Sequence, residues 1–440
     1  MAYDPSLPLD LGDGLVLRQS RVEDTEQLAA FNADVHRGEA AEPAAWVAGW
    51  TRDLMRGNHP THAPDCFTVV EERGTGRIVS ALNLISQTWS YDGVPFGVGR
   101  VELVGTAPDY RRRGLIRRQF EVVHRWSAER GELVQAITGI PWYYRQFGYE
   151  YALELDHARM LAVHTLPEPS DADARFRLRA AVEADAAICV RADAWGRRRY
   201  LVTCQRDEAT WRYEIGGRDK AEPGPPVVWI VETANGQPVG YVTHAGRRDG
   251  AQLRVQAAEL VEGASWQAAA PAIVRGLIEV GNRMAPEPLA ELALLLEREH
   301  PLYRWMPGEP PRRNRGYAWY LRVPDLPAFL WRIAPVLEAR LAASDAAGYD
   351  GYVQLWFYRD GLQLTFEGGR LVAIDPWSTE HTRQATAVFP DLTFLQLLFG
   401  YRSITELSEI YPDCFARPRG AAALLDVLFP KRISKVYGLA

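Results

Sequence analysis

The sequence predicts an α+β protein made of three consecutive domains. Three observations support this. Residues 1–165 run in the order strand, two helices, three strands, helix, strand, helix, strand. Residues 166–310 repeat that order, which indicates an internal duplication at the scale of a domain. Residues 311–440 instead begin with a long helix, followed by three strands and further helices, which predicts a separate α+β module.

In the first domain, alternating and helically spaced apolar residues locate the elements. The predicted strands are 15–18, 66–72, 78–86, 98–106 and 133–138, and the predicted helices are 22–35, 43–56, 112–130 and 141–147. The stretch NHPTHAPD at 58–65 predicts a loop, because proline and asparagine break both patterns.

In the second domain, the linker LPEPSDADAR at 166–175 precedes the first strand, FRLR. The strands VVWIVE, VGYVTHA, AAELVE and LAELALLL are expected, with a helix over 268–284 before the last of them. A second boundary is expected at 307–325, PGEPPRRNRGYAWYLRVPD. Beyond it, a helix over 326–343 and three strands over 351–377 are expected.

Composition excludes several classes of function. A net charge of -6 and a pI of about 5.9 argue against a general nucleic-acid binder. No window approaches 18 consecutive apolar residues, so no membrane span is expected. The acidic, proline-rich N-terminus has no apolar segment of a signal peptide, which predicts a cytoplasmic protein. The four cysteines form no CxxC pair and no cluster with histidine, so free thiols and no metal site are expected.

The stretch VGTAPDYRRRGLIRRQF at 104–120 holds five arginines within eight positions. Pro108 ends the strand because it has no N–H to donate, and a helix follows the arginines. Free N–H groups and the dipole at a helix start attract anions, Gly114 allows close approach of the backbone, and arginine forks bind phosphate oxygens. The pattern predicts a pyrophosphate site at this turn. The alternative is a solvated helix start.

At these residues the chain resembles the GNAT superfamily of acyl-CoA-dependent N-acyltransferases, whose signature here is Arg111-Arg112-Arg113-Gly114-Leu115-Ile116. Ile116 stands where most of the superfamily has glycine or alanine. Together with the later FGY at 147–149, this is similar to the enhanced intracellular survival (Eis) branch of aminoglycoside and lysine acetyltransferases. That branch combines a GNAT domain, a second, degenerate GNAT-like domain and a C-terminal sterol-carrier-like domain, which implies the same for 1–165, 166–310 and 311–440.

The resemblance also implies roles for individual residues. Acetyl-CoA would be the cosubstrate, with no metal. Its pantetheine would pair with the backbone of Val104, Gly105 and Thr106. Its pyrophosphate would lie on the amides of the next turn, with arginine side chains nearby. The residues implied for that turn are Arg111, Arg112, Arg113, Gly114 and Leu115.

The general acid implied by the resemblance is Tyr144, in the helix PWYYRQF. The amine must attack the thioester as a neutral group, and the leaving thiolate needs a proton donor. A tyrosine suits this because its reference pKa, near 10, is within two units of that of a thiol. Attack is direct, so no nucleophilic side chain is required. The alternative is that Tyr144 is a packed aromatic residue, and Tyr143 is the nearest competitor for the catalytic role.

The sequence leaves the identity of the general base open. The resemblance implies the C-terminal carboxylate, here that of Ala440, although the ending KRISKVYGLA differs from the family's usual one. Glu102 on the strand, a water relay, and His59 or His62 in the 58–65 loop are alternatives. For His124 a structural role is expected.

Other aromatic residues have two interpretations. Trp46, Trp50 and Trp89 are expected in the core, and the alternative is an amine pocket built on cation–π contacts. The second repeat has no arginine cluster at its equivalent turn, VEGASWQAAAPAIVRG, so it is expected to bind no CoA. The third module has apolar strands similar to those of lipid carriers, and it is expected mainly to pack on the other domains.

The predicted function is an acetyl-CoA-dependent N-acetyltransferase acting on a primary amine of the aminoglycoside, polyamine or lysine type by direct attack in a ternary complex. The alternatives are a non-catalytic acyl-CoA-binding scaffold or sensor and a lipid carrier acting through the third module. No nucleic-acid or membrane partner is expected. The resemblance implies a homo-oligomer, which is hexameric in the Eis branch.

Overall fold

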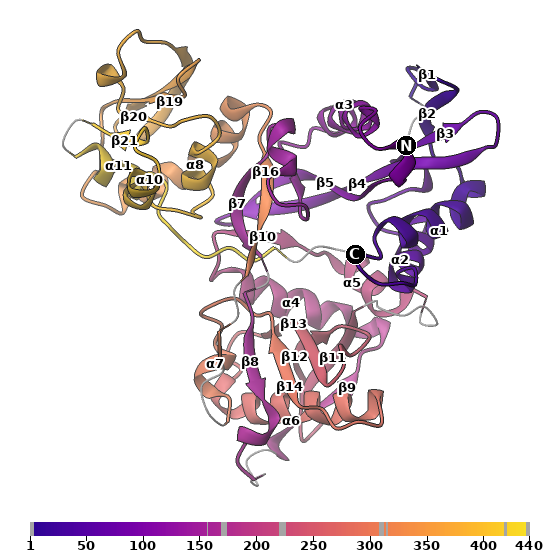
Figure 1. The fold of residues 1–440 in the computed structure, drawn as a ribbon. Coiled ribbons are helices and arrows are strands. Elements are labelled where there is room, and N and C mark those ends of the chain that lie inside the picture. Colours follow the sequence, from indigo (N-terminus) through magenta and orange to yellow (C-terminus); the bar gives the residue numbers. More distant parts are fainter. Residues whose placement is uncertain are drawn as a thin grey trace.

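The computed structural model describes residues 4–155, 157–168, 174–219, 226–307, 312–313, 316–417 and 420–436, with main chain only at 383. They form three lobes, and strands are exchanged among the three segments expected from the sequence (Figure 1). No described helix is long and apolar enough to cross a membrane. All four cysteines are buried free thiols, as predicted.

The first sheet has nine strands in the order β1-β2-β3-β4-β5-β6-β16-β7, and β10 pairs with β4. The strands are β1 (Leu9–Gly12), β2 (Leu15–Gln19), β3 (Phe67–Glu72), β4 (Arg77–Tyr91), β5 (Val94–Thr106), β6 (Val134–Ile137), β7 (Glu150–Leu155), β10 (Val202–Gln205) and β16 (Tyr317–Arg322). Helices α1 (Thr25–Val35) and α2 (Ala45–Met55) cover one face, and α3 (Leu115–Glu129) covers the other (Figure 1).

Amphipathic spacing explains this layering. The apolar stripe of α3, including Phe120 and Trp126, is buried against Leu84 and its neighbours in the sheet. On the other face, Leu28 of α1 and Leu54 of α2 pack against alternate residues of β3 and β4. The predicted strands and helices of this domain are therefore present. In addition, β4 and β5 extend into a long hairpin whose tip is at 92–93, and β1 was not predicted.

The second sheet has seven strands in the order β15-β8-β14-β13-β12-β11-β9. They are β8 (Arg159–Ala162), β9 (Phe176–Ala180), β11 (Val227–Thr233), β12 (Pro238–His244), β13 (Gln252–Leu260), β14 (Glu291–Leu294) and β15 (Arg312–Arg313). The helices of this lobe are α4 (Ala186–Arg197), α5 (Glu208–Arg212), α6 (Trp266–Met284), α7 (Leu302–Trp305) and a π-helical turn η8 (Tyr213–Gly217). In each of these two sheets a long helix joins two parallel strands. Helix α3 joins β5 to β6 in the first sheet, and α6 joins β13 to β14 in the second.

The two sheets exchange strands. β8 comes from the segment expected to form the first domain, yet it lies in the second sheet, with Leu161 opposite Leu292. β16 comes from the region 307–325, which was predicted to be a boundary, yet it is inserted between β6 and β7 of the first sheet. The stretch predicted to be a boundary therefore also contains a strand of the first sheet, and the third lobe begins after it, at α8 (Leu326–Ala342).

The third lobe has a five-stranded sheet in the order β19-β18-β17-β20-β21, with α8 (Leu326–Ala342) as its longest helix. Its other elements are β17 (Gly351–Trp356), β18 (Gly361–Glu367), β19 (Arg370–Trp377), β20 (Ala387–Val388), β21 (Phe415–Ala416), α9 (Phe394–Leu398), α10 (Ile404–Ile410) and α11 (Ala421–Leu428). Its core continues into the first lobe, where Phe329 of α8 contacts the rings of Tyr91 and Phe96. The third lobe thus packs on the β4–β5 hairpin.

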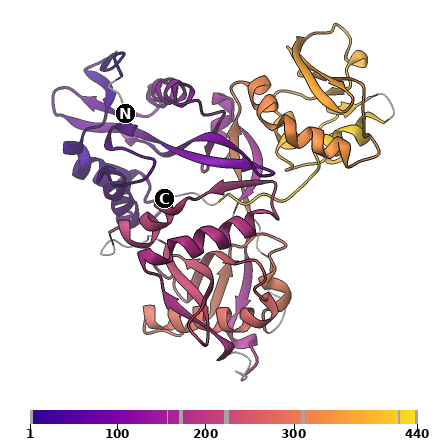
Figure 2. The same ribbon diagram turned by 180° about the vertical axis from the view of Figure 1, so that it is seen from behind.

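Short 3₁₀ turns complete the fold. They are η1 (Val22–Asp24), η2 (Pro64–Cys66), η3 (Pro108–Tyr110), η4 (Tyr143–Phe147), η5 (Val163–Thr165), η7 (Glu183–Asp185) and η9 (Thr382–Gln384). After α11 the chain returns from the third lobe to the other two as an irregular segment, the yellow trace in Figure 2. There Lys435 pairs with Thr203 of β10 in a parallel bridge.

Candidate active site

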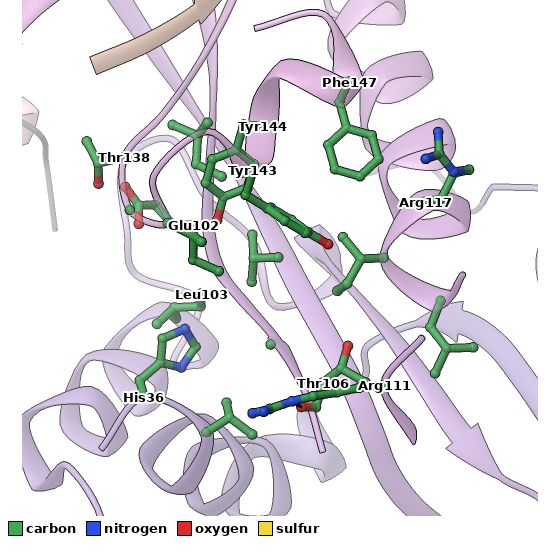
Figure 3. A pocket seen from close by; sticks show the side chains of 18 of the residues that line it. His36, Glu102, Leu103, Thr106, Arg111, Arg117, Thr138, Tyr143, Tyr144 and Phe147 are labelled. Atoms are coloured by element: carbon green, nitrogen blue, oxygen red, sulfur yellow. Dashed lines mark hydrogen bonds between the residues drawn. The ribbon is translucent and has the colours of Figure 1, made fainter. Parts of the chain in front are cut away.

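A cavity of about 870 Å³ opens where β5 separates from β6. Its walls are the second half of β5, the turn before α3, the segment 137–147, and residues of α1 and α2. Figure 3 shows Tyr143, Tyr144 and Glu102 at one end and Thr106 and Arg111 at the other.

The opening results from the geometry of the strands. β5 pairs in parallel with β6 over only three residue pairs, from Val98–Val134 to Arg100–Ala136. On its other edge it continues to pair with β4 as far as Thr106. The edge of residues 101–106 that faces away from β4 is therefore not paired in the sheet, and Val104, Gly105 and Thr106 all line the cavity. Unpaired backbone groups of this kind require a hydrogen-bonding partner.

A bulge shapes the middle of β5. The register with β4 shifts between Ala81 and Asn83, and Leu103 opposite the shift has φ +54°. Two residues further on, a Cβ at Gly105 would lie 2.6 Å from Cγ2 of Val35. The close approach of α1 thus requires glycine at this position.

The turn after β5 forms a cradle at the start of α3. Arg111 is extended, Arg112 has φ +64°, and Gly114 caps the helix with φ +74°. The helix begins at Leu115, three residues later than predicted, because the left-handed conformations at 112 and 114 are incompatible with a helix. A Cβ at Gly114 would meet nothing within 4 Å. Glycine is therefore needed here for its backbone conformation rather than for space.

The arginine side chains around the cradle contact mainly neutral groups. Nε of Arg111 donates to the carbonyl of Thr106 at 3.3 Å, and Arg113 lies over the ring of Tyr110. Arg117 donates to the amide oxygen of Gln146 at 3.0 Å. Arg118 differs, since it pairs with Glu121 and does not line the cavity. Among the described residues, no carboxylate forms an ion pair with Arg111, Arg112, Arg113 or Arg117, so their positive charge is available to an anion.

Tyr144 lies in η4 at the other end of the cavity. It is buried, and its ring packs edge-on against Phe120 and Tyr320. In the described part of the chain its hydroxyl has no hydrogen-bond partner, and it points toward Glu102 (Figure 3). Burial, together with the charge of Glu102, raises the pKa of Tyr144 well above its usual value. The hydroxyl is therefore protonated at neutral pH. Tyr143 also lines the cavity but is only partly buried.

Glu102 is the only carboxylate among the described residues that line this cavity. Arg100 holds it in an ion pair at 2.6 Å. His36 faces the same end of the cavity, with Nδ1 2.9 Å from the carbonyl of Asn32, and burial lowers the pKa of its imidazole. His36 is thus a neutral imidazole near Glu102.

The other candidate bases lie elsewhere. His59 and His62 are buried behind α2, outside the residues that line the cavity, and burial lowers their pKa values to about 4 and about 3. His124 binds the hydroxyl of Tyr149 at 2.8 Å, a structural contact. Ala440 lies outside the residues that the structure describes.

Several lining residues were not identified from the sequence. His36 and residues 138–140 reach the cavity only through tertiary packing, and Leu103 does so through the bulge. Trp89 lies in the core as expected. Trp46 and Trp50 line the cavity as a stacked pair 6.4 Å apart, and Trp50 also packs against the core under α2. The two tryptophans are four residues apart on one helix, which places both side chains on the same face, and this spacing could have identified them as a pair from the sequence.

Comparisons with known proteins agree with this geometry. Residues 17–152 match the family model described as acetyltransferase (GNAT) domain. No curated protein matches the chain. Among solved structures, a GCN5-related N-acetyltransferase from Anabaena variabilis is similar with a TM-score of 0.67 and 13% identity, covering 96% of this chain and 99% of the other.

Two further structures extend the likeness. A GCN5-related N-acetyltransferase from Kribbella flavida has a TM-score of 0.65 and 18% identity, with coverage of 99% and 100%. Eis1 from Mycobacterium abscessus has a TM-score of 0.60 and 18% identity, with coverage of 96% and 99%. The similarity in fold therefore spans all three lobes. The family match assigns an acetyltransferase (GNAT) domain to residues 17–152, in the first lobe.

Proposed function

We propose that this protein transfers the acetyl group of acetyl-CoA to a primary amine by direct attack in a ternary complex. The acceptors proposed are aminoglycosides, polyamines or lysine-like amines. The observation that carries the proposal is one continuous cavity. It runs from Tyr144 and Glu102 along the edge of β5 that β6 leaves unpaired to the turn at Arg111–Arg113, where the arginines form no ion pair among the described residues.

Acetyl-CoA fits this path chemically. The edge at Val104, Gly105 and Thr106 has the alternating N–H and C=O groups that the amides of pantetheine need. The free N–H groups at the start of α3, with Arg111, Arg112 and Arg113 around them, suit a pyrophosphate. The cosubstrate would supply the activated acetyl group, and the residues of the chain would orient it.

Tyr144 is proposed as the general acid. Its hydroxyl is protonated at neutral pH and has no hydrogen-bond partner among the residues described, so it is available to a leaving group in the cavity. Donation of its proton to the departing thiolate would leave CoA as the free thiol.

The base that accepts the proton of the amine is proposed to be the carboxylate of Ala440. Glu102 is the alternative that lines the cavity, where Arg100 holds it in an ion pair. His59 and His62 are less suited, because they are buried away from the cavity.

The other two lobes are proposed as a degenerate GNAT-like domain over 166–310 and a sterol-carrier-like domain over 311–440, apart from β15 and β16, which pair with strands of the other two sheets. The parallel pair of β13 and β14 and the joining helix α6 support the first of these assignments. We also propose that the protein is a cytoplasmic homo-oligomer, with a hexamer as the proposed state. Its subunit count is measurable by light scattering.

The test uses the purified full-length protein with acetyl-CoA and a panel of aminoglycosides, polyamines and lysine derivatives. Release of free thiol is followed with a thiol-reactive dye, and the acetylated amine is identified by mass spectrometry. We expect thiol release that depends on an amine and matches the amount of acetylated product. Tight CoA binding without amine-dependent release would instead favour the acyl-CoA scaffold or sensor.

A further inference from the structure

A buried series of hydrogen bonds connects helix α3 to the end of β5. The hydroxyl of Thr68 in β3 donates to Oε1 of Gln119 in α3 at 3.1 Å, and Nε2 of Gln119 donates to Oγ of Ser80 in β4 at 2.7 Å. Oγ of Ser80 in turn lies 2.9 Å from the carbonyl oxygen of Gly105 and 2.8 Å from the hydroxyl oxygen of Thr106. One side chain of α3 is thus connected through Ser80 to the last two residues of β5.

The hydrogen-bonding capacity of Ser80 gives the direction of each of these bonds. A serine hydroxyl has one hydrogen and two lone pairs. The carbonyl of Gly105 can only accept, so Ser80 donates its hydrogen there, and Gln119 and Thr106 donate to the two lone pairs. Ser80 therefore has its full set of three partners, and its position fixes the carbonyl of Gly105 and the hydroxyl of Thr106 together.

The three side chains that form this connection are fully buried. Thr68, Ser80 and Gln119 each have 0% of their surface exposed. The apolar residues of α3 around Gln119, such as Phe120 and Val123, pack on the same face of the sheet. Apolar packing has no preferred direction, whereas a hydrogen bond between buried groups does. The contact between Gln119 and Ser80 therefore specifies how α3 lies relative to β5.

The contact lies between the two parts of the cavity that the proposed cosubstrate must reach together. Thr106 ends the unpaired edge of β5, and its carbonyl also accepts from Nε of Arg111 at 3.3 Å. Gln119 follows Leu115, the first residue of α3, by about one helical turn. The edge suits pantetheine and the helix start suits pyrophosphate, and both groups belong to one molecule. The affinity for that molecule therefore depends on how well the spacing of the two parts is fixed in advance.

We propose that Gln119 is a positioning residue for acetyl-CoA. Through Ser80 it sets the spacing between the edge at Val104–Thr106 and the start of α3. The inference rests on the proposed use of acetyl-CoA and goes beyond it, because neither Gln119 nor Ser80 is among the described residues that line the cavity. Tyr144 and Glu102 lie at the other end of the cavity, so the transfer step itself does not depend on Gln119 (Figure 3).

Gln119→Met is the test variant, and titration calorimetry of the full-length protein with CoA is the measurement. Methionine is also unbranched and is a good helix former, but it cannot replace the amide as a donor. The change leaves no buried donor unpaired, because the hydroxyl of Thr68 also lies 3.4 Å from the carbonyl of Leu82. We expect CoA to bind about tenfold more weakly, and the KM for acetyl-CoA to rise with kcat within about twofold of wild type.

Ser80→Ala breaks the same connection from the side of the strand. On its own it leaves Nε2 of Gln119 unpaired, whereas the double variant with Gln119→Met leaves neither partner unpaired. If Gln119 acts through Ser80, adding Gln119→Met to Ser80→Ala should weaken CoA binding by less than about twofold. A full further loss in the double variant would mean that the two residues act independently, which would overturn the proposal.

Ser127→Ala is the matched control. Ser127 is also fully buried on α3 and accepts from Nε2 of Gln135 at 2.9 Å, near the end of the helix that lies away from the cradle. This variant should lower the melting temperature, as the loss of a buried hydrogen bond does, but leave the Kd of CoA unchanged. That result separates positioning from general stability.

Two outcomes would overturn the inference and leave the proposed function intact. In one, Gln119→Met binds CoA as the wild type does, and in the other, Ser127→Ala weakens CoA binding as much as Gln119→Met. Wild-type protein that binds no CoA would overturn the proposed function, and the role of Gln119 would fall with it.

Discussion

The hydroxyl of Tyr317 donates a hydrogen bond of 2.7 Å to the carbonyl oxygen of Gly139. Tyr317 belongs to β16, whereas Gly139 lies in the loop that precedes Tyr144 and borders the cavity. A series of hydrogen bonds continues from the hydroxyl of Tyr317 to that of Tyr151, which lies 2.7 Å from the hydroxyl of Tyr320. The ring of Tyr320 also contacts the ring of Tyr144. A strand from the segment between the second and third lobes thus fixes the loop that carries the proposed acid.

We predict that Tyr317→Phe lowers kcat by up to about tenfold, because loss of one hydrogen bond costs about 1 kcal/mol and loosens the loop before Tyr144. Steady-state kinetics measure this, and the affinity for CoA should change little. Tyr352→Phe is the control, since that side chain is exposed on β17. Equal kcat values for both variants would show that the Tyr317 contact does not position the loop.

Tyr144→Phe is predicted to lower kcat by about 10²-fold, the typical contribution of a general acid. Phenylalanine retains the packing against Phe120 and Tyr320 but has no proton to donate. The affinity for CoA, measured by calorimetry, should be unchanged. Tyr143→Phe is the matched variant and should retain most of its activity, and a larger loss there than at Tyr144 would move the acid to Tyr143.

Gly114→Ala is predicted to raise the KM for acetyl-CoA by up to about tenfold. The added methyl meets no atom within 4 Å, so its cost is the left-handed backbone alone, about 1–2 kcal/mol. Relaxation of that strain would turn the N–H groups of the cradle away from the pyrophosphate. Gly74→Ala is the control, because its Cβ also meets no neighbour and it has no positive φ. A KM unchanged from wild type would mean that the cradle does not depend on this conformation.

The local parts of the site were predictable from the sequence. The turn before α3 is contiguous, and its strand, proline, glycine and helix signals fall in order, so the cradle was predicted to within a few residues. The unpaired edge at Val104–Thr106 and the position of Tyr144 came from the family resemblance rather than from a local pattern.

The distant parts were not predictable. β16 is six residues long, and its partners in β6 and β7 are more than 160 residues away in the chain, so nothing in its own pattern marks it as part of the first sheet. The bulge at Leu103 and the entry of His36 and Trp46 into the cavity depend on how α1 and α2 pack on β5. Such contacts follow from tertiary structure, which periodicity does not encode.

The stability of the protein is predicted to fall as the pH is lowered from about 7 to 4. Burial lowers the pKa of His62 to about 3, whereas in the unfolded chain it is near 6.5. The native imidazole therefore stays neutral in this window while the unfolded one takes up a proton, which favours unfolding at acid pH.

His62→Asn should make this dependence shallower, because asparagine retains a donor toward the carbonyl of Leu54 and does not titrate. The melting temperature is measured at intervals over this pH range. His381→Asn, at an exposed position, is the control and should follow the wild-type slope. A wild-type slope in His62→Asn would assign the acid sensitivity to other groups.

The last prediction concerns the proposed base. The described end of the chain is held firmly: the N–H of Leu201 donates to the carbonyl of Ile433, and that of Lys435 donates to the carbonyl of Val202, each at 2.9 Å. The side chain of Lys435 is buried near Glu259 and Glu297. Removal of residues 437–440 leaves these contacts in place, so the fold and the melting temperature should be retained.

If the carboxylate of Ala440 accepts the proton of the amine, this truncation should lower kcat by about 10²-fold without weakening CoA binding. Glu102→Gln should then cost less than tenfold, because that carboxylate is already paired with Arg100. Both variants are compared under amine saturation at several pH values, since more of the amine is neutral at higher pH and a missing base is then partly compensated. Full activity of the truncated protein would exclude Ala440, and a larger loss in Glu102→Gln would assign the base to Glu102.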